Sequence, residues 1–203
     1  MSGQLETIFR EYTDPFGFLA AQGRMYRFAP AALNTTATGA TSFATTTATF
    51  LLEVVAGTQY AVIPAEARLF QAGTVAGGAI SYFMEIDNAD RFTSGGTALG
   101  AHNCRMGGAD IPSGITMYDT NSSAIVSTNA AGVRIDGALL GQDVSPAEGA
   151  VNAVIWSPTA GIDILVPTAS LGASWIINTS AASTGPTWIY SFKAAVVPLD
   201  WLT

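Results

Sequence analysis

Charged side chains are scarce in this sequence. Asp, Glu, Lys and Arg make up only 11% of the 203 residues, against about a quarter in ordinary soluble domains, and Lys193 is the only lysine. A folded monomer of this size exposes a surface on the order of 9,000 Å². Most of that surface must therefore consist of Thr, Ser, Ala, Gly and Asn, and such a surface suits burial against other copies of the chain.

Basic residues are also too few for a nucleic-acid-binding surface. The chain has eight Lys and Arg residues, spread along its length, and a net charge of −7. Binding to phosphate groups needs clustered basic side chains. We therefore expect no direct contact with nucleic acid.

Long unbroken apolar runs are missing as well. Two stretches, residues 28–52 and 164–192, carry no charge, but both are interrupted by Pro and Gly, and the first holds eight threonines between positions 35 and 49. A transmembrane helix needs about 20 consecutive apolar residues. The first six residues show neither the basic nor the apolar region of a signal peptide. We expect no membrane segment and no secretion signal.

The single cysteine, Cys104, excludes an intramolecular disulfide and a cysteine-rich metal site. Stability must therefore come from packing and strand pairing.

The first 28 residues differ from the rest, because six charged and six aromatic residues gather there. A short helix over residues 6–12 should end at Asp14-Pro15, since a residue before proline is driven out of the α region. The segment either packs on its own domain or lies as an arm on a neighbouring subunit, and both interpretations stay open. We predict an N-terminal arm over residues 1–30 and a single domain over residues 31–203.

From about residue 35 the sequence is typical of β-strands, with β-branched and aromatic runs separated by Gly, Asn and Pro. Pro64 should end one strand, and Gly77-Gly78 and Asp136-Gly137 should form turns; after residue 30 only residues 145–150 hint at a helix. Such a pattern predicts an all-β fold, an antiparallel β-sandwich of the jelly-roll type. The expected strands are 41–55 (one or two strands), 60–63, 67–70, 79–86, 98–106, 115–118, 124–128, 133–140, 151–156, 162–166, 174–178 and 188–197.

One short segment could carry nucleophilic chemistry. His102 and Cys104 are two residues apart, so on a strand they share a face, and Asn103 lies between them. A catalytic pair normally comes from separate segments, however, and no family-specific sequence surrounds this cysteine. We favour a buried thiol beside a hydrogen-bonded histidine over a catalytic pair.

Residues 85–90 collect several oxygen ligands, including Asp87 and Asp90, which a hard cation such as Ca²⁺ would require. The EF-hand spacing is absent, and a turn in which Asp and Asn bond to their own backbone explains the same residues. We favour the turn. No acid pair flanked by aromatic residues stands out, and the glycine-rich segments 95–100 and 107–108 lack the context of a phosphate-binding loop.

Four tryptophans could form a platform for sugar stacking. Three of them, Trp156, Trp175 and Trp188, lie in apolar strand patterns, where packing in the core is the commoner outcome. Trp201 is the exception and is a candidate for contact between subunits. We thus predict no catalytic, metal-binding or cofactor-binding residues, and no cofactor.

The sequence of residues 60–78, 84–91 and 94–97 resembles a pattern found in structural proteins of tailed bacteriophages. The Ala-, Thr- and Gly-rich composition also resembles that of capsid-decoration and fibre-base proteins. The likeness is close over about 40 residues and includes no functional motif. It implies a virion component of jelly-roll type, present in many copies and without enzymatic activity.

The scarcity of charge and the resemblance agree on one expectation. We expect a non-enzymatic virion protein, made in the host cytoplasm, that decorates a capsid or is a minor capsid protein. It should form a homo-oligomer, preferably a trimer, and bind other capsid proteins. The alternative is a spike or fibre module that binds host glycans; a polysaccharide-degrading enzyme comes last, because no acid pair supports it.

Overall fold

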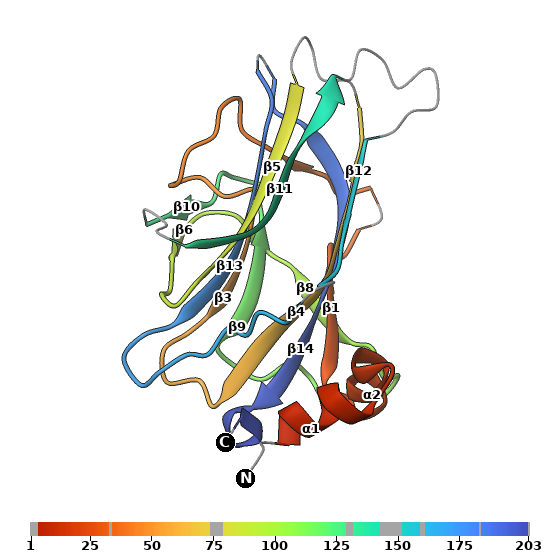
Figure 1. Ribbon diagram of the computed structural model, residues 1–203. Helices are drawn as coiled ribbons and strands as arrows, with labels where there is room; N and C mark the ends of the chain where they lie inside the picture. The colour runs from red at the N-terminus through yellow and green to blue at the C-terminus, as the bar shows by residue number, and fades with distance from the viewer. Residues whose placement is uncertain are drawn as a thin grey trace.

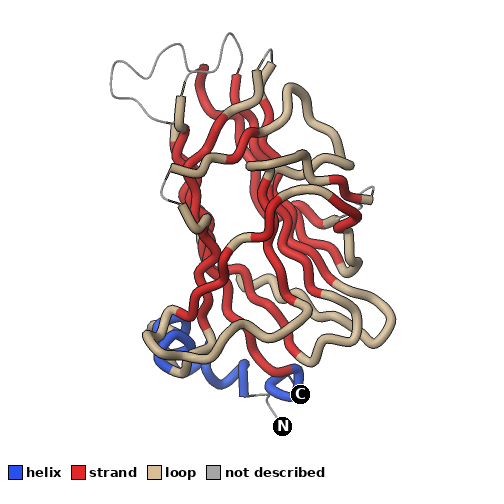
Figure 2. The backbone as a smooth tube through the Cα atoms, turned by 180° about the vertical axis from the view of Figure 1, so that it is seen from behind, coloured by secondary structure: helices blue, strands red, loops and turns tan. Residues whose placement is uncertain are grey.

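The computed structural model describes residues 4–32, 34–73, 79–128, 132–142, 152–158, 161–182 and 184–202. Two antiparallel sheets face each other, and short helices lie at the end where both termini are found (Figure 1). Seen from behind, the strands form two layers with loops at both ends (Figure 2). The prediction of an all-β, antiparallel sandwich is therefore confirmed.

The first sheet has the order β12-β4-β14-β1-β8, with β2 paired to β14; the second has the order β11-β5-β13-β3-β9-β7. The strands of the first sheet are β1 (Met25–Ala29), β2 (Ala37–Thr38), β4 (Tyr60–Gln71), β8 (Gly100–Asn103), β12 (Ala153–Trp156) and β14 (Thr187–Pro198). Those of the second sheet are β3 (Phe50–Val54), β5 (Ala79–Asp87), β7 (Thr97–Ala98), β9 (Ile115–Asp119), β11 (Val133–Gln142) and β13 (Ala173–Ser180).

Eight of these strands pair in a nested pattern. Strand β1 pairs with β14, β3 with β13, β4 with β12, and β5 with β11, all antiparallel. The chain is thus one long hairpin whose successive pairs fall alternately in the first and the second sheet. The hairpin reverses direction in the connection from β5 to β11. This connection includes β6 (Phe92–Ser94) and β10 (Val126–Ser127), which form a short two-stranded sheet.

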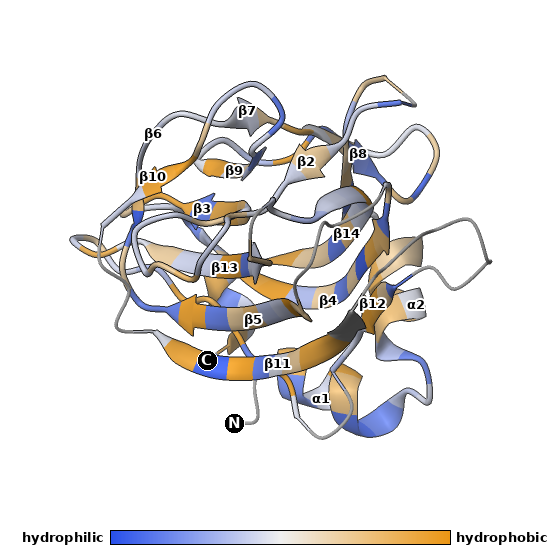
Figure 3. Cartoon of the chain, turned by 90° about the horizontal axis from the view of Figure 1, so that it is seen from above, coloured by the Kyte–Doolittle hydropathy of each residue, from blue (hydrophilic) through white to orange (hydrophobic). Residues whose placement is uncertain are grey.

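The core lies between the two sheets, and it follows the alternation of side chains along each strand. In β14, the alternating residues Trp188, Tyr190 and Phe192 are buried in the core, as their spacing predicts. In β5, Ile80, Tyr82 and Met84 are buried in the same way. Seen from above, apolar and polar residues alternate along several of these strands (Figure 3).

The N-terminal segment folds as two helices, α1 (Gln4–Glu11) and α2 (Pro15–Ala21), followed by β1. Helix α1 ends near the predicted position, whereas α2 is not expected from the sequence. Asp14 starts it, because its Oδ1 accepts a hydrogen bond of 2.8 Å from the backbone N–H of Gly17 and Pro15 suits the first helical turn. No helix of the described residues is long and apolar enough to cross a membrane.

Both helices pack on their own chain. They cover one end of the outer face of the first sheet, together with the 3₁₀ turn η2 (Leu199–Leu202). The side chains buried in this contact are Leu5, Ile8 and Leu19 from the helices and Met25, Ala61, Ile63, Ala65, Ala195 and Val197 from the sheet. Strand β1 also belongs to the first sheet, while a role of residues 1–30 as an arm toward another copy stays a prediction.

Several local predictions are wrong. The Thr-rich residues 41–49 form turns and loops, and residues 162–166 contain only a single bridge, Leu165 to Val62. Strand β4 runs through Pro64, because its pairing with β14 shifts register there: Lys193 pairs with Glu66 and Ala194 with Pro64, so Ala65 is the extra residue of a bulge in β4. Asp136 and Gly137 lie inside β11 beside a register shift, so they form no hairpin turn. Residues 77–78 and 145–150 lie outside the described residues.

Candidate functional site

His102 and Cys104 lie on the outer face of the first sheet, at and just beyond the end of β8. Both side chains are exposed, so the expectation of a buried thiol is wrong. Cys104 lines a groove of about 390 Å³ together with Arg27 and Lys193. Nothing in this geometry orients the imidazole as a base toward the sulfur.

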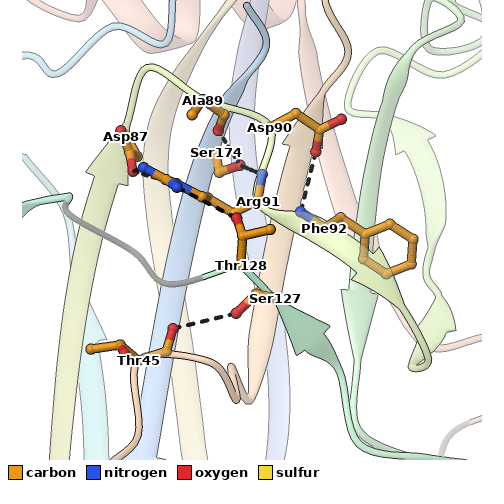
Figure 4. A network of polar contacts seen from close by, with 9 residues as sticks. All are labelled: Thr45, Asp87, Ala89, Asp90, Arg91, Phe92, Ser127, Thr128 and Ser174. Atoms are coloured by element: carbon orange, nitrogen blue, oxygen red, sulfur yellow. Dashed lines mark hydrogen bonds and ion pairs between the residues drawn. The ribbon is translucent and has the colours of Figure 1, made fainter.

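Hydrogen bonds within the loop between β5 and β6, and from the loop to Ser174 on β13, hold this loop in place (Figure 4). The Nε of Arg91 donates to Oδ2 of Asp87 at 2.6 Å, and Oδ1 of Asp90 accepts from the backbone N–H of Phe92 at 3.2 Å. The hydroxyl of Ser174 accepts from the backbone N–H of Arg91 at 3.0 Å. The side chain of Asp90 thus bonds to the backbone of its own turn, as the turn interpretation expects, whereas the side chain of Asp87 pairs with Arg91. Within the described part of the chain, no three His, Cys, Asp or Glu side chains gather as a metal site would require.

An acid pair that the sequence does not reveal lies beside this loop. Glu53 on β3 reaches Asp90 with its carboxyl group, and the hydroxyl of Tyr118 on β9 donates to Oε2 of Glu53 at 3.1 Å. Burial, and after it the neighbouring Asp90 carboxylate, raises the pKa of Glu53 to about 7. The ring of Phe92 stacks on Tyr118 with centroids 3.9 Å apart. The only signal in the sequence is a lone Glu within the apolar run of residues 50–55.

Tyrosine hydroxyls serve as partners for two more carboxylates. Tyr190 donates to Asp119, which is 1% exposed and also accepts from the backbone N–H of Asn121 at 2.9 Å. Tyr82 donates to Oδ2 of Asp136 at 3.1 Å, and burial, followed by this carboxylate, raises the pKa of Tyr82 to about 12. Neutral hydroxyl donors thus bind these two carboxylates, in a chain that has few Lys and Arg side chains to pair with them.

The four tryptophans do not form a shared exposed platform. Trp175 and Trp188 are fully buried in the core, and the indole N–H of Trp188 donates to Oγ1 of Thr179 at 2.9 Å. Trp156 packs against Trp175 with ring centroids 5.6 Å apart. Trp201 packs with the N-terminal helices, and the guanidinium of Arg24 lies 5.4 Å from its ring centroid.

Among the described residues, the helices and η2 cover one end of the outer face of the first sheet. Beyond the helices it exposes Phe70 by 38%, Ile155 by 67% and Ile189 by 49%. These three residues lie on neighbouring strands, since Phe70 pairs with Ile189 across β4 and β14 and Ile155 with Arg68 across β12 and β4. Large apolar side chains that gather on an exposed face are typical of a surface that contacts another molecule.

Basic residues lie next to these apolar side chains. Lys193 pairs with Arg27 across β14 and β1, and Arg27 pairs with His102 across β1 and β8. Glu66 accepts from Arg68 at 2.8 Å and lies 3.0 Å from Lys193. Burial alone would raise the pKa of Glu66, but the hydrogen bonds and charges of Lys193 and Arg68 lower it. We refer to Phe70, Ile155, Ile189, Arg27, Arg68 and Lys193 as the open face.

Two further grooves are lined by both apolar and charged residues. One, of about 600 Å³, lies between the edge strands β11 and β12 and is lined by Val133, Ile135, Ile155 and Trp156 among others. The second, of about 470 Å³, lies beside α1 and is lined by Leu5, Phe9, Ile162, Ile164 and Leu202, with Glu6 and Arg10 on its rim.

Comparison of the chain with protein-family models, with curated proteins and with solved structures finds no match in any of the three.

Proposed function

We propose that this protein is a non-enzymatic structural component of a bacteriophage virion that associates with itself and with the coat, as a capsid-decorating or minor capsid protein. The open face supports this proposal most directly. It combines exposed apolar side chains with a few ordered charges on a regular sheet, which is the composition of a protein contact surface.

We also propose that the fold is a jelly roll. The nested pairing of first with last, second with seventh, third with sixth and fourth with fifth strand is what results when one long hairpin is rolled into two sheets. Jelly rolls occur in viral capsid and lectin domains. The fold alone does not define a function, so the likeness adds support only by analogy.

The alternative, a glycan-binding spike or fibre module, would need exposed aromatic rings on which sugars stack. The tryptophans offer little support for it, because two are buried in the core and the other two pack against neighbouring residues of the same chain. Capsid association therefore remains the preferred proposal.

The experiment is mass spectrometry and immuno-electron microscopy of particles purified from the phage or prophage whose genome encodes the chain. The proposal predicts that the protein co-purifies with particles in many copies and that antibody labels the head. Its presence in the lysate but not in washed particles would refute the virion role, and labelling of the tail tip alone would favour the spike or fibre alternative.

A further inference from the structure

We propose that the open face of one copy binds the helical end of a second copy, where the helical end is the surface formed by α1, α2 and η2. This inference rests on the self-association proposed above and assigns it to two particular surfaces. The partner is therefore another copy of this chain, and two unlike surfaces are in contact.

The open face is positively charged although the chain as a whole is negative. Arg27 is exposed, the Arg68 side chain is 47% exposed, and Lys193 lies between them on the neighbouring strands. Glu66 is the carboxylate among them, and it already pairs with both Arg68 and Lys193. A net positive charge is thus available to a partner next to three exposed apolar side chains.

The helical end has the complementary character. Four carboxylates, those of Glu6, Glu11, Asp14 and Asp200, accompany two arginines, Arg10 and Arg24, and all four acidic residues are exposed. The groove of about 470 Å³ beside α1, which Glu6 and Arg10 line together with apolar residues, can receive apolar side chains. A surface of net negative charge with an apolar groove therefore faces a surface of net positive charge with exposed apolar side chains.

Charge selects among the ways in which two copies can meet. Two open faces would oppose two surfaces of net positive charge, and two helical ends would oppose two surfaces of net negative charge. Like charges placed opposite each other cost free energy. The open face of one copy therefore meets the helical end of the other. This pairing forms either twice about a two-fold axis, or head to tail in a ring or filament.

A charge exchange tests the contact. One double variant carries Arg27→Glu and Arg68→Glu on the open face, and the other carries Glu6→Arg and Glu11→Arg on the helical end. A matched control, Arg134→Glu, reverses an exposed arginine on β11 of the other sheet. Sedimentation velocity of each purified full chain and of the equimolar mixture of the two double variants measures association, and circular dichroism with thermal unfolding shows that each is folded.

The expected result is that each double variant alone dissociates at least about tenfold more readily than the wild type, a loss typical of opposed charges. The mixture should regain association, because each reversed surface then meets one of opposite sign, and Arg134→Glu should behave as the wild type. If both folded variants associate like the wild type, the protein associates through other surfaces and this inference is wrong while the proposed function stands. If the wild type stays monomeric at every concentration, the proposed self-association itself fails.

Discussion

The carboxyl pair of Glu53 and Asp90 predicts a specific loss of stability as the pH rises from about 4.5 to about 7. The pKa of Glu53 rises from its ordinary value of 4.5 to about 7 in the folded protein. Since the folded state binds the proton more tightly than the unfolded state, the pair stabilises the fold fully below pH 4.5. That contribution is lost progressively as the pH rises through about 7.

The size of the effect follows from the shift. Each pKa unit corresponds to about 1.4 kcal/mol, so the full shift of Glu53 would amount to about 3 kcal/mol. Glu53 is only partly buried, and solvent screening reduces the value to about 1–2 kcal/mol. The variant Glu53→Gln keeps a neutral, hydrogen-bonding side chain at every pH. It should match the wild type at pH 4.5 and exceed its stability by this amount at pH 8.

Urea unfolding at a series of pH values measures this difference. Asp90→Asn should flatten the profile only in part, because it removes the neighbouring carboxylate but leaves Glu53 buried, and the double variant should add little to Glu53→Gln. Glu11→Gln, which replaces an exposed carboxylate on α1, serves as the matched control and should keep the wild-type profile. A difference between Glu53→Gln and the wild type that is the same at pH 4.5 and pH 8 would refute the reasoning.

Three further predictions concern single positions. Tyr190→Phe removes a donor from the buried Asp119 carboxylate and should lower the free energy of unfolding, measured in urea, by about 1–3 kcal/mol; an unchanged value would show that the carboxylate does not depend on this hydroxyl. Gly95 and Gly57 both have a φ of 79°, but only a Cβ at Gly95 would collide with a backbone carbonyl. Gly57→Ala should therefore cost about 1 kcal/mol and Gly95→Ala clearly more, and equal thermal shifts would contradict this. Cys104 should be alkylated by iodoacetamide in the folded protein, as seen by intact mass, and labelling only in denaturant would contradict its exposure.

The sequence predicts the core well where side chains alternate regularly. Strands β5 and β14 show this, because the residues with apolar period-2 spacing are the ones that are buried. Composition misleads where local propensity competes with tertiary contacts. The Thr-rich residues 41–49 have β-forming side chains but lie in loops. Pro64 interrupts no strand, because a one-residue bulge in β4 beside it accommodates the proline.

The candidate surfaces are harder to predict, because they join residues that are distant in sequence. Glu53 and Asp90 meet only once β3 and the loop after β5 are placed on the same face of the second sheet. Likewise, Arg27, Arg68 and Lys193 become neighbours only through the order of β4, β14 and β1. The spacing of residues along one strand shows which face they occupy but not which strands lie beside it.

The nested pairing has a consequence for folding in the cell. Strand β14 lies between β4 and β1, and Ala195 and Val197 support the N-terminal helices, so neither end of the first sheet is complete before the last strand has been synthesised. Contacts between such distant segments make folding slow. They also mean that neither the open face nor the helical end is in place while the chain is partly translated, so the contact proposed above would form only after β14 has been added.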